Sequence, residues 1–124
     1  MIPAPIAIHI IEHAEHRIPN TAGDWYFDGH TLVIAASKLP EARESWCLAA
    51  HELVEALLCT AQGITPEQVD AFDLAFTGDG EPGDLVDAPY HHAHQLATAV
   101  ERLLAFALGV DWNQYEADLD ALFD

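Results

Sequence analysis

The segment WCLAAHELVEALLC, residues 46–59, is almost entirely apolar but contains one histidine and two glutamates. On a helix, His51 and Glu55 lie one turn apart and point in the same direction. Two ligands on one rigid element are what a zinc site requires, with a third ligand and a water supplied from elsewhere. Glu52 lies about 100° around the helix from His51, beside the metal, where it could take a proton from a bound water. The segment therefore predicts a hydrolytic metal site.

The pattern is H-E-x-x-E, a variant of the H-E-x-x-H motif of zinc hydrolases with Glu55 in place of the second histidine. Carboxylate is an acceptable zinc ligand, and it is harder than imidazole, so manganese and iron are alternatives. Residues 48, 51, 52, 55 and 59 could instead form the narrow solvent-facing stripe of an amphipathic helix. We favour the metal, because such a stripe would lack the usual surface residues Lys, Arg, Gln and Ser.

A third ligand is expected from the sequence PYHHAHQLATAVE, which has three histidines in four positions. His91 and His94 would share one face of a helix, and either could complete the site. His92 points elsewhere, and Glu101 continues the shared face two turns later. Tyr90 could orient a substrate or stabilise an oxyanion, or it could simply pack at the start of the helix.

Asp70 and Asp73 share a face of the preceding predicted helix. With Glu52 and Glu55 they form an E-x-x-E…D-x-x-D pattern. This is similar to the all-α nucleoside triphosphate pyrophosphohydrolases, in which four carboxylates hold magnesium. The two aspartates could equally form a solvated outer face, and a hairpin before the first carboxylate helix fits that all-helical family poorly.

The elements that must position these residues form an α+β domain, predicted as a single domain over residues 1–124. A β-branched strand and a hairpin around Asp28-Gly29 make a small sheet over about residues 5–37. The sheet is expected to pack on a central helix that carries the motif. Turn, proline and capping signals place the four helices at about 40–62, 66–77, 89–108 and 112–123.

The charge balance is strongly acidic, with 21 Asp and Glu against four Lys and Arg and a net charge of −17. This field repels nucleic acid and anionic membranes, and it attracts metals and basic partners. We expect neither direct nucleic-acid binding nor membrane association. A further alternative is a non-enzymatic protein that covers a basic, nucleic-acid-binding surface of a host protein. Substrate and oligomeric state stay open.

The N-terminal sequence MIPAPIAIHI has two prolines and no basic flank, and is not expected to be a signal peptide. The sequence has no run of about 18 apolar residues, so we expect no membrane span. Cys47 and Cys59 lie roughly 18 Å apart on one predicted helix and cannot bond to each other. Reduced, buried thiols favour the cytoplasm.

Two resemblances follow from these motifs. Residues 24–62, with a hairpin, an edge-like strand TLVIAAS and the helix AAHELVEALL, resemble the core of the minimal zincin metallopeptidases, including SprT-like and phage-repressor-cleaving types. This resemblance implies that His51 and Glu55 bind zinc, that Glu52 is the base, and that a peptide or protein is the substrate.

HELVEALL, GITPEQVDAFD, APYHHAH and GVDWNQYEADL resemble, over most of the chain, a small family of uncharacterised phage and prophage proteins. This second resemblance implies a viral or mobile-element origin and a host-cytoplasmic setting. It implies no reaction.

Overall fold

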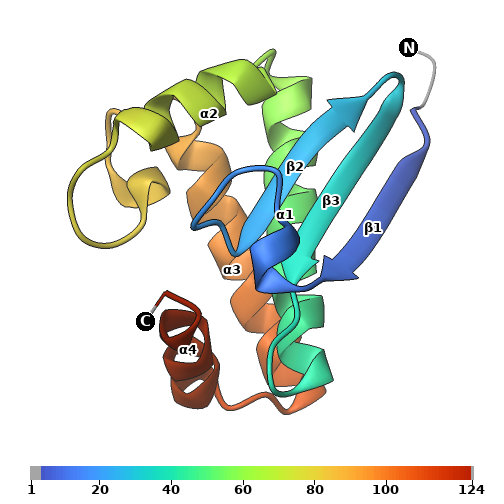
Figure 1. Ribbon diagram of the computed structural model, residues 1–124, viewed down its shortest axis with the longest axis vertical. Helices are drawn as coiled ribbons and strands as arrows, with labels where there is room; N and C mark the ends of the chain where they lie inside the picture. Colours follow the sequence, from blue (N-terminus) through green and yellow to red (C-terminus); the bar gives the residue numbers. More distant parts are fainter. Residues whose placement is uncertain (1–3, 124) are drawn as a thin grey trace.

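The computed structural model describes residues 4–123 as a three-stranded sheet followed by four α-helices (Figure 1). The predicted α+β class, with an N-terminal sheet, is confirmed. In chain order the elements are β1 (Ile6–Ile11), the 3-10 turn η1 (His13–Glu15), β2 (Gly23–Asp28), β3 (Thr31–Ser37), α1 (Ala42–Ala61), α2 (Pro66–Ala75), the 3-10 turn η2 (Pro82–Asp84), α3 (His91–Leu108) and α4 (Trp112–Ala121).

β3 is the central strand of the sheet, with the order β1-β3-β2. It pairs in parallel with β1, where Ile8 lies opposite Ile34, and antiparallel with β2, where Trp25 lies opposite the same residue. The expectation that β3 is edge-like is therefore wrong. Its residues 32–37 are all buried, and a strand buried throughout satisfies its backbone groups best with a partner on each side.

The predicted hairpin joins β2 to β3 through Gly29 and His30, and Gly29 has a φ of 61°. The longer connection from β1 to β2 crosses the end of β3. Two histidines of this connection, His13 in η1 and His16 directly after it, hold it against the end of β3. Their Nδ1 and Nε2 atoms lie 2.9 Å and 2.8 Å, respectively, from the hydroxyl oxygen of Ser37. The sheet thus keeps β1 and β2 on opposite sides of β3.

The helix bounds agree with the predicted ones within two residues at every end, because local signals set them. Thr65 and Gln68 form the expected capping box at the start of α2. Gly109 ends α3 in the left-handed conformation, with a φ of 73°. The capping box of α1 uses Glu41 and Glu44.

α1 lies between the sheet and α3 (Figure 1). One side contacts β2 and β3, and the other packs along α3. Two apolar clusters fill these contacts, one around Trp25, Ile34 and Ala56 and the other around Cys47 and Tyr115. A helix covered on two sides buries its polar residues too, and this places the motif inside the protein.

Among residues 4–123, no helix is long and apolar enough to cross a membrane. Both cysteines are buried and unpaired, as expected.

Candidate metal centre

The motif residues of α1 are buried, which contradicts the interpretation of a solvent-facing stripe. His51, Glu52 and Glu55 are 7%, 8% and 5% exposed. Burying an imidazole and two carboxylates is unfavourable unless partners compensate for the lost water. The partners of these three groups therefore decide what the site can do.

Two imidazole nitrogens converge on one carboxylate oxygen. His51 Nε2 lies 3.3 Å from Glu55 Oε2, and His94 Nδ1 lies 3.1 Å from the same oxygen. The three residues each offer a ligand atom within 4.8 Å of the others. Ligands at about 2.0–2.1 Å from a tetrahedral zinc ion stand about 3.4 Å from one another. The two measured separations thus nearly equal the edge of a zinc tetrahedron.

Contacts behind the three residues fix their orientation. His51 Nδ1 lies 2.8 Å from Glu101 Oε1, and the Tyr115 hydroxyl donates to Glu101 Oε2 at 2.5 Å. Trp25 Nε1 donates to the second oxygen of Glu55 at 3.2 Å. A histidine that donates its Nδ1 proton to a carboxylate keeps Nε2 free for a metal. This arrangement leaves one oxygen of Glu55 and one nitrogen of His51 facing each other.

In the metal-free site, protonation of histidine balances the negative charge of Glu55. Burial lowers the pKa of His51, but hydrogen bonds to Glu101 and Glu55 outweigh it and raise that pKa to about 11. Burial raises the pKa of Glu55, but hydrogen bonds from His51 and His94 outweigh it and lower that pKa to about 2. The cluster is therefore an imidazolium–carboxylate pair, in which a divalent cation could replace protons.

Glu52 has a different environment from Glu55. Among residues 4–123 its carboxyl group accepts no hydrogen bond, and it forms an ion pair with His51, whose Nε2 lies 3.8 Å from Oε2. Burial, followed by the charge of Glu55, raises the pKa of Glu52 well above its ordinary value. A buried carboxyl group whose pKa is raised in this way is suited to proton transfer.

Glu52 faces a small cavity of about 80 Å³ that the three candidate ligands also line. The cavity is acidic and contains no lysine or arginine among its lining residues. Its remaining walls come from the start of β2, from α2, from the loop before α3 and from the residue preceding that helix: Gly23, Asp73, Glu81, Pro82 and Tyr90.

Two glycines make room for site side chains. A Cβ atom on Gly23 would lie 2.7 Å from Glu52 Cγ, and one on Gly83 would lie 2.6 Å from His94 Cγ. Neither glycine has a positive φ, so the backbone there would accept alanine and the obstacle is purely steric.

We expect Gly83→Ala to weaken zinc binding by about 10- to 100-fold, the range found for disturbed partners of metal ligands, because the methyl group displaces the His94 ring. The measurement is competition with a chromophoric chelator. Gly78→Ala is the matched control, since it lies in the same loop and its Cβ would meet the Phe76 ring at 3.3 Å. Equal affinities of the two variants would contradict the placement of His94.

Of the two alternative third ligands, the structure brings His94 to the group. The His91 Nδ1 atom lies 2.9 Å from the carbonyl oxygen of Gly83 instead, and His92 is exposed. Tyr90 is buried and donates its hydroxyl to Asp73. It lies at the cavity, and its catalytic role stays a prediction.

The four carboxylates of the magnesium alternative are not all together. Glu52, Glu55 and Asp73 line the cavity. Asp70 lies outside it and binds Arg17, with 3.0 Å between Arg17 Nη2 and Asp70 Oδ2. Burial raises the pKa of Asp73 to about 6, against the hydrogen bond from Tyr90.

Several contacts of the site were not predicted. Trp25 and Tyr115 carry no sequence signal that distinguishes them from core aromatic residues. Glu101 was placed on the face of His94 by its spacing, without a partner. The loop at 77–87 also reaches the site. In the structure Asp84 Oδ1 lies 3.3 Å from His94 Nε2.

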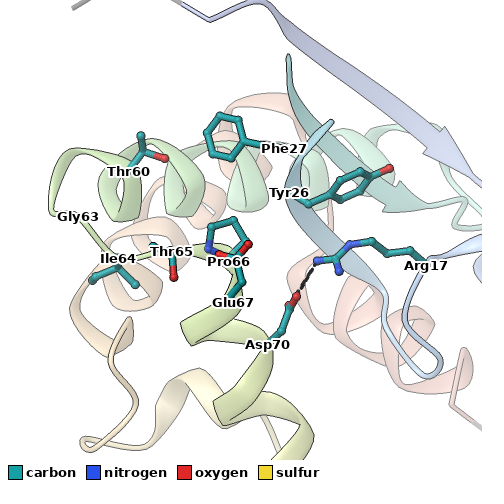
Figure 2. Close-up of a pocket in the computed structure, with 10 residues that line it drawn as sticks. All are labelled: Arg17, Tyr26, Phe27, Thr60, Gly63, Ile64, Thr65, Pro66, Glu67 and Asp70. Atoms are coloured by element: carbon teal, nitrogen blue, oxygen red, sulfur yellow. Dashed lines mark hydrogen bonds and ion pairs between the residues drawn. The ribbon is translucent and has the colours of Figure 1, made fainter. Parts of the chain in front are cut away.

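A second hollow lies elsewhere on the surface. A groove of about 530 Å³ runs between β2 and the start of α2 (Figure 2). Tyr26 and Phe27 form its aromatic side, and the ion pair between Arg17 and Asp70 lies at one end. It shares no lining residue with the acidic cavity.

Comparison of the chain with protein-family models, with curated proteins and with solved structures found no match. The two resemblances therefore stay predictions, and the geometry of His51, Glu55 and His94 is what supports a metal centre.

Proposed function

We propose that His51, Glu55 and His94 bind a zinc ion and that the protein is a metal-dependent hydrolase of peptide or amide bonds. One observation carries the proposal: two imidazole nitrogens approach a single carboxylate oxygen at 3.3 Å and 3.1 Å. The hydrogen bond that His51 donates to Glu101 and the one that Glu55 accepts from Trp25 support it, because they orient the ligands from behind.

The donor set supports zinc before other metals. Two histidines and one glutamate are a common ligand set of catalytic zinc sites, with the fourth position left for water. Manganese and iron are the next candidates, because the carboxylate is a hard ligand. The cavity beside the cluster supports an open fourth position.

The residues divide the chemistry between them. Zinc, when bound by these residues, would supply Lewis-acid polarisation and would acidify a water molecule. Glu52, without a hydrogen-bond partner of its own among the described residues, would accept a proton from the attacking water and return it to the leaving nitrogen. Tyr90, which lines the same cavity, orients the substrate. The substrate we propose is a peptide or protein, in the cytoplasm of the host cell.

The alternatives receive less support. Magnesium-dependent pyrophosphate hydrolysis by four carboxylates needs Asp70 in the site, whereas Asp70 pairs with Arg17 outside the cavity. A non-enzymatic role, binding a basic host protein, is supported by the net charge of −17 but by no feature of the buried site.

Elemental analysis of protein loaded with zinc and desalted tests the proposal. We expect one equivalent of zinc in the unaltered protein and its loss in His51→Ala, Glu55→Ala and His94→Ala. His92→Ala is the matched control, because it removes an exposed histidine from the same helix.

The metal centre would be overturned if the unaltered protein bound no zinc, or if all three variants retained the zinc. His91→Ala is expected to retain the metal, since its ring faces the Gly83 carbonyl. Loss of metal in that variant alone would assign the third ligand to His91.

A further inference from the structure

Two acids form the open side of the metal cavity. Asp73 on α2 and Glu81, just before η2, line the cavity and are exposed to solvent, whereas Glu52 and Glu55 line it from buried positions. Tyr90 donates its hydroxyl to Oδ1 of Asp73, so Oδ2 of that carboxylate is left to face a ligand. We call Asp73 and Glu81 the acidic mouth. A substrate that reaches the metal ligands must pass it.

No basic side chain of the protein neutralises the acidic mouth. The residues that line the cavity include no lysine or arginine. The four basic side chains of the chain are engaged elsewhere: Arg17 with Asp24 and Asp70, Lys38 with Glu12, Arg43 with Glu41, and Arg102 over the ring of Trp112. A compensating positive charge at the mouth therefore has to come from another molecule.

The proposed zinc ion does not supply that charge. Zn²⁺ carries two positive charges, and its histidine ligands bind it in their neutral form. The two buried carboxylates of the cavity, Glu52 and Glu55, offset those two charges when both are ionised. The carboxylates of Asp73 and Glu81 are then in excess. A cleft lined by charges of one sign attracts a ligand of the opposite sign.

An organic cation suits the acidic mouth better than a second metal ion. Among residues 4–123, Asp73 and Glu81 belong to no group of three ligand atoms within 4.8 Å of one another, which His51, Glu55 and His94 do form. An ammonium group needs no such shell, because its three hydrogen-bond donors can reach separate acceptors.

We propose that the acidic mouth binds a positively charged amine of the substrate, directly beside the amide bond at the metal. This inference rests on the proposed hydrolase function, and it names the substrate class of the same site. The cavity is only about 80 Å³, so an amine held by Asp73 and Glu81 belongs to a residue that adjoins the bond. The α-amino terminus of a peptide and a lysine side chain both supply such a group.

Binding of four small amides to the zinc-loaded protein tests the proposal without requiring turnover. Lysine amide carries both amines, norleucine amide only the α-amine, Nα-acetyllysine amide only the side-chain amine, and Nα-acetylnorleucine amide neither. Chemical-shift titration at about pH 7, where both amines are mostly protonated, gives the affinities. We expect a singly charged amide to bind about tenfold more tightly than the neutral one, the worth of a hydrogen bond to a charged group. The amide that does so identifies the source of the amine.

Glu81→Gln should reduce this preference about fivefold, the upper value of an exposed ion pair. Asp79→Asn is the matched control, because Asp79 is an exposed acid of the same loop that does not line the cavity. It removes one charge from a chain of net charge −17 and should leave the preference unchanged. Both side chains are exposed, and circular dichroism checks that both variants fold.

Equal affinities of the four amides would overturn the acidic mouth, as would equal effects of Glu81→Gln and Asp79→Asn. Zinc content and peptide hydrolysis, measured on the same samples, report the proposed function separately. Selective binding of an amine by a protein that hydrolyses no peptide would support the mouth and overturn the hydrolase. Hydrolysis that ignores the charge beside the bond would do the reverse. If the protein holds no zinc, the same titration of the metal-free protein decides the mouth alone.

Discussion

Glu52→Gln is expected to abolish hydrolysis while leaving one equivalent of metal in place. The variant keeps the shape of the side chain and removes its ability to accept a proton. Proton transfer by a positioned group is worth about 10²- to 10⁴-fold in rate, so residual turnover should fall by at least the lower figure. Release of fluorescence from a library of quenched peptides, with zinc content measured on the same sample, reports both properties.

The same substitution has an unusual expected effect on stability. Glu52 is buried, lacks a hydrogen bond from the described residues, and has a raised pKa. Ionising it at neutral pH opposes folding, so a neutral amide should raise the melting temperature of the metal-free protein. A group retained at the expense of stability is typical of a functional site.

Glu55→Gln is the matched comparison for Glu52→Gln, because it makes the same chemical change one turn away on α1. There we expect loss of metal and a lower melting temperature, since Glu55 is the shared partner of His51 and His94. Metal loss in Glu52→Gln would make Glu52 a ligand, and full turnover in that variant would remove it as the base.

The gain in melting temperature on adding zinc is expected to grow with pH. Free zinc at 100 times its dissociation constant adds about 2.7 kcal/mol, or about 10 °C for a domain of this size. This increase with pH has two causes, because the metal-free and the zinc-bound protein respond to pH in opposite directions. It is measured by thermal unfolding in the presence of zinc and of a chelator, at about pH 5.5 and about pH 8.

The metal-free protein loses stability as the pH rises. The His51 pKa of about 11 lies above its ordinary value of 6.5, so the contribution of His51 is complete below pH 6.5 and is lost toward pH 11. The Glu55 pKa of about 2 lies below its ordinary value of 4.5, so the contribution of Glu55 is complete above pH 4.5 and is lost toward pH 2. Together they stabilise the metal-free fold most between pH 4.5 and 6.5.

The zinc-bound protein follows the opposite trend. Both histidines must be deprotonated to bind, so zinc affinity rises with pH. The difference in melting temperature should therefore be small at the lower pH and large at the higher one. His92→Ala, with its exposed ring, should behave like the unaltered protein. A zinc effect that shrinks with rising pH would contradict binding by these imidazoles.

The amino-acid sequence by itself determined the local elements of this protein. Capping residues, glycines and hydrophobic spacing act over a few positions, so the helix bounds and the β2–β3 hairpin were predicted closely. The same local geometry placed His51 and Glu55 on one face of α1, and these two do meet. Glu52 was also placed beside them from spacing alone.

The packing of α1 between the sheet and α3 was decided at the tertiary level. His91 and His94 are equivalent by spacing, and their difference arises because η2 covers the first turn of α3 and engages His91. Burial of the motif, the pairing of Asp70 with Arg17, and the support from Trp25 and Tyr115 all join positions far apart in the chain. Periodicity states which side of a helix a residue occupies, but not what lies against that side.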